Sequence, residues 1–120
     1  MATFSKQLLS ASTTGAPVKV VATASTGTTV HTTGTSATII DEVWLYGYNS
    51  STSTVVLTVQ YGGTTSPDND LKITLPAQSG LTLLAPGLVL KGTGSAGSSV
   101  YAYAATANVV TISGYVNRIS

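Results

Sequence analysis

The chain has 120 residues, of which 8% are charged, and its formal net charge is +1. An ordinary soluble domain carries about 25% charged residues, whereas here 21 Thr and 15 Ser supply most of the polarity. The five basic residues are scattered singly, which argues against a surface for nucleic acid or anionic lipid. Because Cys is absent, disulfides and thiolate metal sites are excluded. No apolar run reaches the roughly 18 residues of a membrane span.

Residues 1–15 are predicted to form a flexible N-terminal arm, followed by a single domain over residues 16–120. A short helical turn through Lys6–Leu9 is possible, but the Thr, Gly and Pro residues that follow prevent a longer helix. The arm has few apolar side chains, and two of them, Phe4 and Leu8, are candidates for contact with a neighbouring subunit. The alternative is a loose terminus.

The domain is predicted to be all-β, because no segment keeps a helical period and short alternating segments are separated by turn-forming residues. In chain order the predicted strands are Val18–Ala24, Thr28–Thr32, Thr38–Asn49, Thr54–Tyr61, Leu71–Leu75, a kinked strand or two short edge pieces over Leu81–Leu84 and Leu88–Leu90, Ser99–Ala105 and Val109–Val116. Two hairpins are expected, one joining Thr38–Asn49 to Thr54–Tyr61 and one joining the last two strands. About eight strands of this kind favour an antiparallel β-sandwich of jelly-roll type.

The long segment Thr38–Asn49 contains the only Trp and is predicted to be the central strand. Because side chains alternate along a strand, Val43 and Leu45 face one side, toward the core beside the apolar residues of the next strand. The aromatic side chains face the other side, at Trp44, Tyr46 and Tyr48. This aromatic row could belong to the core, to a subunit interface or to a platform on which sugar rings stack.

A second pair of aromatic residues repeats the alternation on a later strand, at Tyr101 and Tyr103. Their two-residue spacing places both rings on one face of that strand. We group them with the aromatic row as candidate interface residues.

Two motifs suggest ligand binding. Residues Gly92–Gly97 match GxGxxG, but a dinucleotide fingerprint requires a helix after the glycines, and a strand is predicted there. We therefore expect a mobile surface loop.

The carboxylate and amide oxygens of Asp68–Asp70 could bind Ca²⁺, but the spacing is too sparse for an EF-hand and these residue types also favour turns. No metal ion and no cofactor is predicted.

The sequence offers little for catalysis. Asp41 and Glu42 are adjacent on a strand and so lie on opposite faces, which prevents them from acting as paired carboxylates. One of them is expected to form an ion pair or to hinder edge-to-edge aggregation. His31 is the only His, and no Ser stands in a GxSxG elbow. We predict a structural or surface role for His31 and no enzymatic activity.

Three segments carry a family resemblance: DEVWLY at 41–46, LKGTG at 90–94 and SGYVNRI at 113–119. With them, the chain from Thr38 to Ile119 resembles small virion structural proteins of tailed bacteriophages, of the capsid decoration or cement type. These segments are sheet and turn patterns rather than catalytic signatures.

The resemblance implies a non-enzymatic protein, made in the bacterial host cytoplasm and bound in many copies to the major capsid protein. It also implies a homotrimer on the capsid exterior of the virion, with no nucleic-acid or membrane partner. One alternative is a carbohydrate-binding module that uses Trp44, Tyr46 and Tyr48. Another is a neck or tail component of the same kind of virion.

Overall fold

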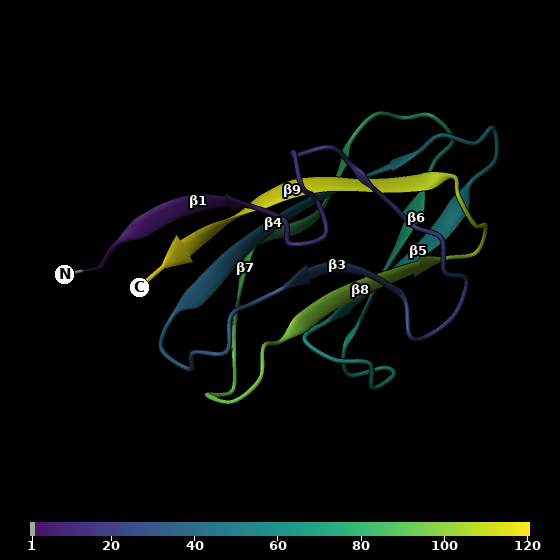
Figure 1. Cartoon of the computed structure of the whole chain (residues 1–120). Coiled ribbons are helices and arrows are strands. Elements are labelled where there is room, and N and C mark those ends of the chain that lie inside the picture. Colours follow the sequence, from purple (N-terminus) through teal and green to yellow (C-terminus); the bar gives the residue numbers. More distant parts are fainter. Residues whose placement is uncertain (1) are drawn as a thin grey trace.

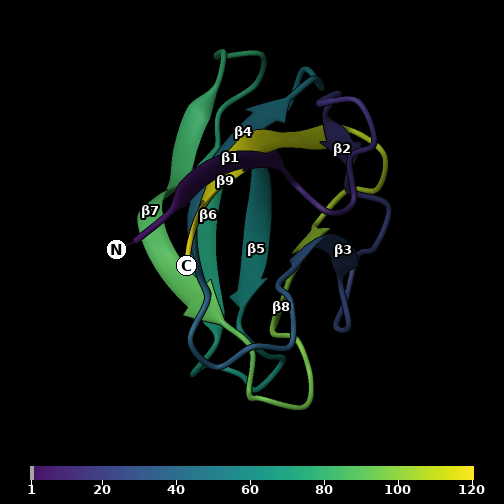
Figure 2. The same cartoon turned by 60° about the vertical axis from the view of Figure 1, so that its left-hand side comes forward.

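The computed structural model describes residues 2–120, which form two antiparallel β-sheets packed face to face (Figures 1 and 2). The strands are β1 (Phe4–Leu8), β2 (Val18–Lys19), β3 (Thr28–Thr32), β4 (Ile40–Asn49), β5 (Val55–Tyr61), β6 (Asp70–Leu75), β7 (Thr82–Lys91), β8 (Ser99–Ala104) and β9 (Val110–Ile119). Sheet A has the order β1-β9-β4-β7, with β2 also on β9, and sheet B has the order β3-β8-β5-β6. The predicted all-β sandwich is confirmed.

The strand order is that of a jelly roll. β1 and β2 pair one after the other along β9, so they act as one interrupted strand. The remaining pairs are β3 with β8, β4 with β7, and β5 with β6. The chain is thus one long hairpin of four strand pairs, rolled up so that the first and third pairs form sheet A and the second and fourth pairs form sheet B. None of the described residues forms a helix long and apolar enough to cross a membrane.

Both predicted hairpins are wrong. β4 lies in sheet A and β5 in sheet B, and the same separation holds for β8 and β9. Between β4 and β5 the chain crosses from one sheet to the other, and the buried Asn49 holds this crossing with its side-chain NH₂. That group donates to the carbonyl oxygens of Ser53, at 2.7 Å, and of Leu75 in β6, at 3.1 Å. Alternation shows which residues face the core but not which strand lies alongside.

The core consists of the inward-facing apolar residues of both sheets. Val43 and Leu45 of β4 are fully buried, as are Leu57 and Val59 of β5. These residues meet across the sandwich rather than side by side in one sheet, because their strands belong to different sheets. The predicted core face of the central strand is confirmed, and the predicted neighbour relation within one sheet is wrong.

The N-terminal segment contributes to sheet A. Residues Phe4–Leu8 are extended and pair with β9 from Ile119 to Tyr115, so the helical turn considered for Lys6–Leu9 is wrong. Leu9 then enters the core, where it is buried. Figure 1 shows β1 and the end of β9 side by side at one tip of the molecule.

Two other segments differ from the predicted strands. β7 runs unbroken over Thr82–Lys91, with two register shifts against β4, so the kinked form of the prediction is correct and the two separate edge pieces are not. The strand predicted over Val18–Ala24 is reduced to Val18–Lys19.

Candidate functional site

The outer face of sheet A carries the aromatic row of β4. Along β4 the residues at 41, 43, 45, 47 and 49 are buried, whereas those at 40, 42, 44, 46 and 48 are half-buried. Trp44, Tyr46 and Tyr48 therefore lie on the outside of the sandwich, and none belongs to the core cluster. The interpretation of this row as core is wrong, which leaves the interface and the sugar platform.

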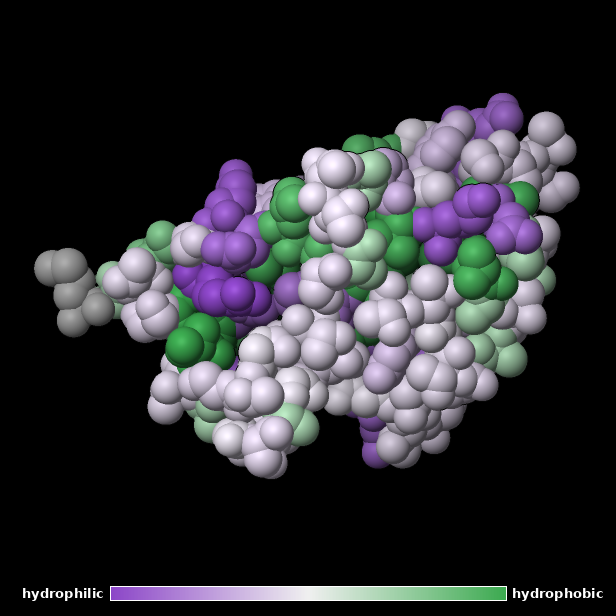
Figure 3. Space-filling view, in the orientation of Figure 1, coloured by the Kyte–Doolittle hydropathy of each residue, from purple (hydrophilic) through white to green (hydrophobic). Residues whose placement is uncertain are grey.

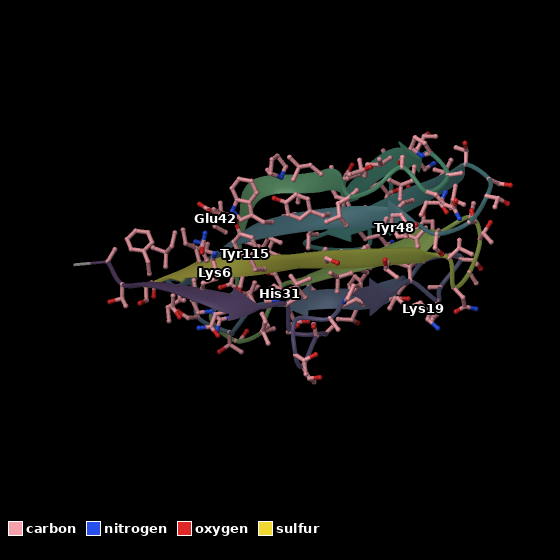
Figure 4. The ribbon with its side chains drawn as sticks, turned by 90° about the horizontal axis from the view of Figure 1, so that it is seen from above. Lys6, Lys19, His31, Glu42, Tyr48 and Tyr115 are labelled. Carbon is pink, nitrogen blue, oxygen red and sulfur yellow. The ribbon has the colours of Figure 1, made fainter. Side chains whose placement is uncertain are left out.

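Pairing with β9 adds a fourth aromatic residue. Trp44 lies opposite Tyr115, and their rings stack with centroids 6.4 Å apart and planes 15° from parallel. Lys6 of β1 places its Nζ 4.5 Å from the centre of the Tyr115 ring, within the range of a cation–π interaction. We call Trp44, Tyr46, Tyr48 and Tyr115 the aromatic face. Figure 4, which looks down on this sheet, shows Lys6 and Glu42 beside Tyr115, with Tyr48 farther along.

Glu42 is held next to the stacked rings. Its Oε1 accepts the indole N–H of Trp44 at 2.8 Å and the side-chain N–H of Asn117 at 3.1 Å. These two hydrogen bonds, the one from Trp44 foremost, lower the pKa of the Glu42 carboxyl. The two hydrogen bonds thus favour the charged form of the carboxylate, and the bond from Trp44 orients the indole.

Exposed apolar side chains surround the aromatic face. Phe4 is 70% exposed and Leu8 48%, both on the outward side of β1, while Leu83 at 47% and Val89 at 57% project from β7. The register confirms the common face, since Val89 lies opposite Glu42 and Leu83 opposite Tyr46. A hollow of about 400 Å³ lies at the β7 edge, lined by Ile40, Val89, Leu90 and Lys91.

The chain as a whole has few charged residues. Figure 3, which views the sandwich from the side rather than onto sheet A, shows a mostly pale surface, as expected for Ser, Thr and Gly, with green apolar patches and several purple hydrophilic clusters. Such a surface loses little hydration free energy when a partner covers it, compared with a surface rich in Lys and Glu.

The second predicted aromatic pair lies on the opposite side of the molecule. Along β8 the residues at 100, 102 and 104 are buried, and Tyr101 and Tyr103 alternate with them. Their rings therefore project from the outer face of sheet B. The seven candidate interface residues divide between two faces: Phe4, Leu8, Trp44, Tyr46 and Tyr48 share sheet A, and the two Tyr of β8 do not.

A buried polar network links the two sheets. The Nε2 of His31, on β3, lies 2.7 Å from Oδ2 of Asp41, on β4. Arg118 of β9 donates its Nε–H to Oδ1 of Asp41 at 2.8 Å and an Nη2–H to Oδ2 at 3.1 Å. Burial alone would raise the pKa of the Asp41 carboxyl, but the hydrogen bonds from Arg118 and His31 and the charge of Arg118 outweigh it, so this pKa is lowered. The ion pair expected for one of the two acids is confirmed at Asp41.

The network does not present a serine hydroxyl to the imidazole. Nδ1 of His31 accepts the backbone N–H of Ser10 at 3.0 Å, and the Ser10 hydroxyl oxygen accepts the backbone N–H of Thr32 at 2.7 Å. His31 is fully buried. Both nitrogens therefore have structural partners, which is the role expected for this His.

The two motifs lie in a loop and in a turn, as the sequence predicts. The glycine loop is followed by β8 rather than a helix, and Gly92 and Gly97 lie where a Cβ would collide with the backbone of Gly34 and of Thr33. In the acidic turn, the Asn69 amide bonds to Thr65 and Tyr61 of its own loop. Among residues 2–120 no group of three or more His, Asp or Glu side chains could hold a metal ion.

The sequence reasoning missed Tyr115, Asn117 and Lys6 as neighbours of the aromatic row. Tyr115 lies about seventy positions from Trp44, and only the pairing of β4 with β9 brings them together. The sequence contains one weak indication of this face. Tyr115 and Asn117 flank the buried Val116, so alternation along β9 places both on its outer side.

Comparison with protein-family models, with curated proteins and with solved structures gave no match to the chain. The fold and the geometry described above are therefore the basis for the functional proposal.

Proposed function

We propose that this protein is a non-enzymatic structural component of a virion, which decorates and stabilises a phage capsid by binding across subunits of the major capsid protein. The observation that carries the proposal is the outer face of sheet A. There, four aromatic residues and four exposed apolar side chains share one face, on which the charged residues include Lys6, Lys19 and Glu42. Aromatic residues are enriched in protein–protein interfaces relative to the rest of the surface.

In this proposal the protein stabilises the capsid by binding to it and catalyses no reaction. A protein that buries surface on two capsid subunits at once adds binding free energy only to the assembled lattice, and so opposes the separation of its parts. A standard interface buries about 1,600 Å² in total. A homotrimer on the capsid exterior would make several such contacts, and their linkage would raise the avidity well above the affinity of each one.

Phe4 and Leu8 are proposed to extend this interface along β1. Deleting the first residues is a poor test of their role, because the deletion would also disturb Leu9, which is buried in the core. Single substitutions on the exposed face leave the core intact.

The experiment compares two exposed valines on opposite faces. Val89→Lys places a charge on the outer face of sheet A, whereas Val56→Lys places one on the outer face of sheet B, where Val56 is 40% exposed. Each purified variant is added to capsids that lack the protein, and bound copies are counted. We expect Val89→Lys to weaken binding about tenfold or more and Val56→Lys to bind like the unmodified chain. Equal binding by both variants, or no binding by the unmodified chain, contradicts the proposal.

Copy number distinguishes a decoration protein from a neck or tail component of the same virion. A decoration protein covers the whole shell, whereas a neck or tail part occupies one vertex.

One observation favours a carbohydrate-binding function as the second candidate. The stacked pair of Trp44 and Tyr115 lies beside a fixed carboxylate, Glu42, and a carboxamide, Asn117. Rings that contact the faces of a sugar, together with groups that bind hydroxyls, would suit an oligosaccharide. A glycan-binding assay of Trp44→Ala separates the two candidates. Loss of glycan binding with unchanged capsid binding supports the carbohydrate function, and loss of capsid binding alone supports the structural one.

A further inference from the structure

The buried network begins at the N-terminal segment and ends near the C-terminal end of the described chain. Ser10 contacts His31 of sheet B, His31 contacts Asp41 of sheet A, and Asp41 contacts Arg118 of β9. Each contact joins a different element, so the state of the single imidazole affects how the N-terminal segment is held.

The two partners of His31 fix its tautomer. A carboxylate only accepts hydrogen bonds and a backbone N–H only donates them. Because Asp41 faces Nε2, this nitrogen carries the proton, and because the Ser10 N–H faces Nδ1 at 3.0 Å, Nδ1 has none. The imidazole is therefore neutral while the Ser10 contact is intact. A second proton on Nδ1 would point directly at the N–H of Ser10.

The segment after β1 passes from sheet A to sheet B and lies against β3. Besides the imidazole contact, the Ser10 hydroxyl accepts the Thr32 N–H at 2.7 Å, and the Ala11 N–H donates to the Val30 carbonyl at 3.3 Å. We call Ser10–Ser12 the strap. It is exposed at Ser10 and Ala11, so it can leave β3 without opening the core. Leu9 and β1 remain held by the core and by β9.

The other titratable groups near the imidazole keep their protonation states at neutral and mildly acidic pH. Asp41 stays ionised because its pKa is lowered, and Arg118 stays charged because the Asp41 hydrogen bonds raise its pKa. Tyr61 of β5, which feels the Asp41 charge, keeps its proton because burial and that charge raise its pKa to about 12.

We propose that His31 is a pH-sensitive latch, in which protonation of Nδ1 breaks the Ser10 contact and releases the strap from β3. The closed state has no place for the second proton, whereas the open state exposes Nδ1 to water. The state that binds more protons gains population as the pH falls, so acid favours the open strap. This inference concerns the isolated chain and does not depend on which partner the aromatic face binds.

The size of the effect follows from linkage. A freely accessible imidazole takes up a proton near pH 6.5. If the closed state takes up none, the open-to-closed ratio of the strap rises about tenfold between about pH 7.5 and pH 5.5.

The test measures hydrogen exchange of individual amides in the full chain, with rates corrected for the intrinsic effect of pH. We expect the protection of the Ser10 and Thr32 amides to fall about tenfold over this pH range, while the Val59 amide in the middle of sheet B keeps its protection. In His31→Gln, whose side chain cannot be protonated, the protection of the same two amides should not depend on pH. Unchanged protection in the unmodified chain, or an equal fall in the variant, overturns the proposal.

A second measurement keeps the test decisive should His31→Gln fail to fold. The nitrogen chemical shifts of the imidazole in the unmodified chain report which nitrogens carry protons. We expect Nδ1 to become protonated with the same midpoint as the loss of strap protection. Protonation without loss of protection, or loss of protection with Nδ1 still unprotonated, contradicts the latch.

Discussion

Gly87 of β7 provides the space that the indole of Trp44 occupies. A Cβ at position 87 would lie 2.8 Å from Cζ2 of Trp44, and Gly87 has a φ of +77°. This glycine therefore meets two requirements at once, a left-handed backbone conformation and an unobstructed contact with the ring. The orientation of the aromatic face depends on both.

Gly87→Ala should displace the indole and destabilise the fold by about 1–3 kcal/mol, because it adds both backbone strain and a steric clash. The fluorescence of the single Trp will report the displacement, and urea unfolding will give the loss of stability. A matched control is Gly80→Ala. Gly80 has a similar φ of +84°, but no atom lies within 4 Å of the place that a Cβ would take, so this variant isolates the strain. If both variants leave the fluorescence unchanged, the proposed contact between Gly87 and the indole is not what orients Trp44.

Arg118→Gln should destabilise the fold by about 2–3 kcal/mol, because it leaves the buried Asp41 carboxylate without its charged partner. This loss is at the low end for a buried pair, since Arg118 is itself partly exposed to solvent. Chemical unfolding at neutral pH gives the measurement. Lys19→Gln is the control, because Lys19 is exposed and makes no ion pair with the described residues. Equal stability of the two variants would show that the buried pair contributes nothing.

Asp41 should also make the free energy of unfolding depend on pH in the acidic range. Its pKa is lower in the folded chain than in the unfolded chain, so the folded state favours the ionised form. The contribution of Asp41 to the free energy of unfolding is complete above the pKa of the unfolded chain, about 3.9, and is lost as the pH falls through the lower pKa of the folded chain. Unfolding midpoints should therefore fall more steeply below about pH 4 in the unmodified chain than in Asp41→Asn. Parallel curves for the two proteins would contradict this assignment.

Tyr61 should make the free energy of unfolding depend on pH in the alkaline range. Burial, with a smaller effect of the Asp41 charge, raises its pKa to about 12, so the folded chain keeps the phenol proton after the unfolded chain has lost it near pH 10. Its contribution is complete below about pH 10 and is lost as the pH rises toward the folded value. Ultraviolet absorption of tyrosinate in the unmodified chain and in Tyr61→Phe will identify the late-titrating group. The substitution also removes the hydrogen bond from the Tyr61 hydroxyl to the Leu88 carbonyl. An unchanged titration curve in the variant would assign the late group to another Tyr.

The positions of most strands could be predicted from the sequence, but their partners could not. Thr28–Thr32 matches β3 at both ends, and β4 and β5 begin within two residues of their predicted starts. Alternation and turn residues are local properties, which one segment reveals by itself. Pairing depends on the whole topology, and β4 and β5 have the same pattern whether they share a sheet or face each other. β1 could not be predicted because an edge strand with Ser5 and Gln7 on its inner side shows no apolar alternation.

The candidate site could be predicted in part for the same reason. The two-residue spacing of Trp44, Tyr46 and Tyr48 was enough to place them on one face. It was not enough to tell an inner from an outer face, because both sides of β4 carry apolar side chains and one acid each. The contacts of Asp41 with His31 and Arg118 join three strands, so no local pattern could reveal them.

The position of β9 inside sheet A has a consequence for the order of folding during synthesis. β9 lies between β1 and β4, yet it is made after both, so β1 has no partner strand and β4 has only β7 until β9 has left the ribosome. Until then, two strands that are interior or paired in the final sheet have open edges, which can pair with other chains. Pairings between residues so distant in sequence also form slowly. Nascent chains stalled before Val110 should therefore be more readily cleaved by protease than chains released after Ile119, and equal resistance would show that sheet A forms without β9.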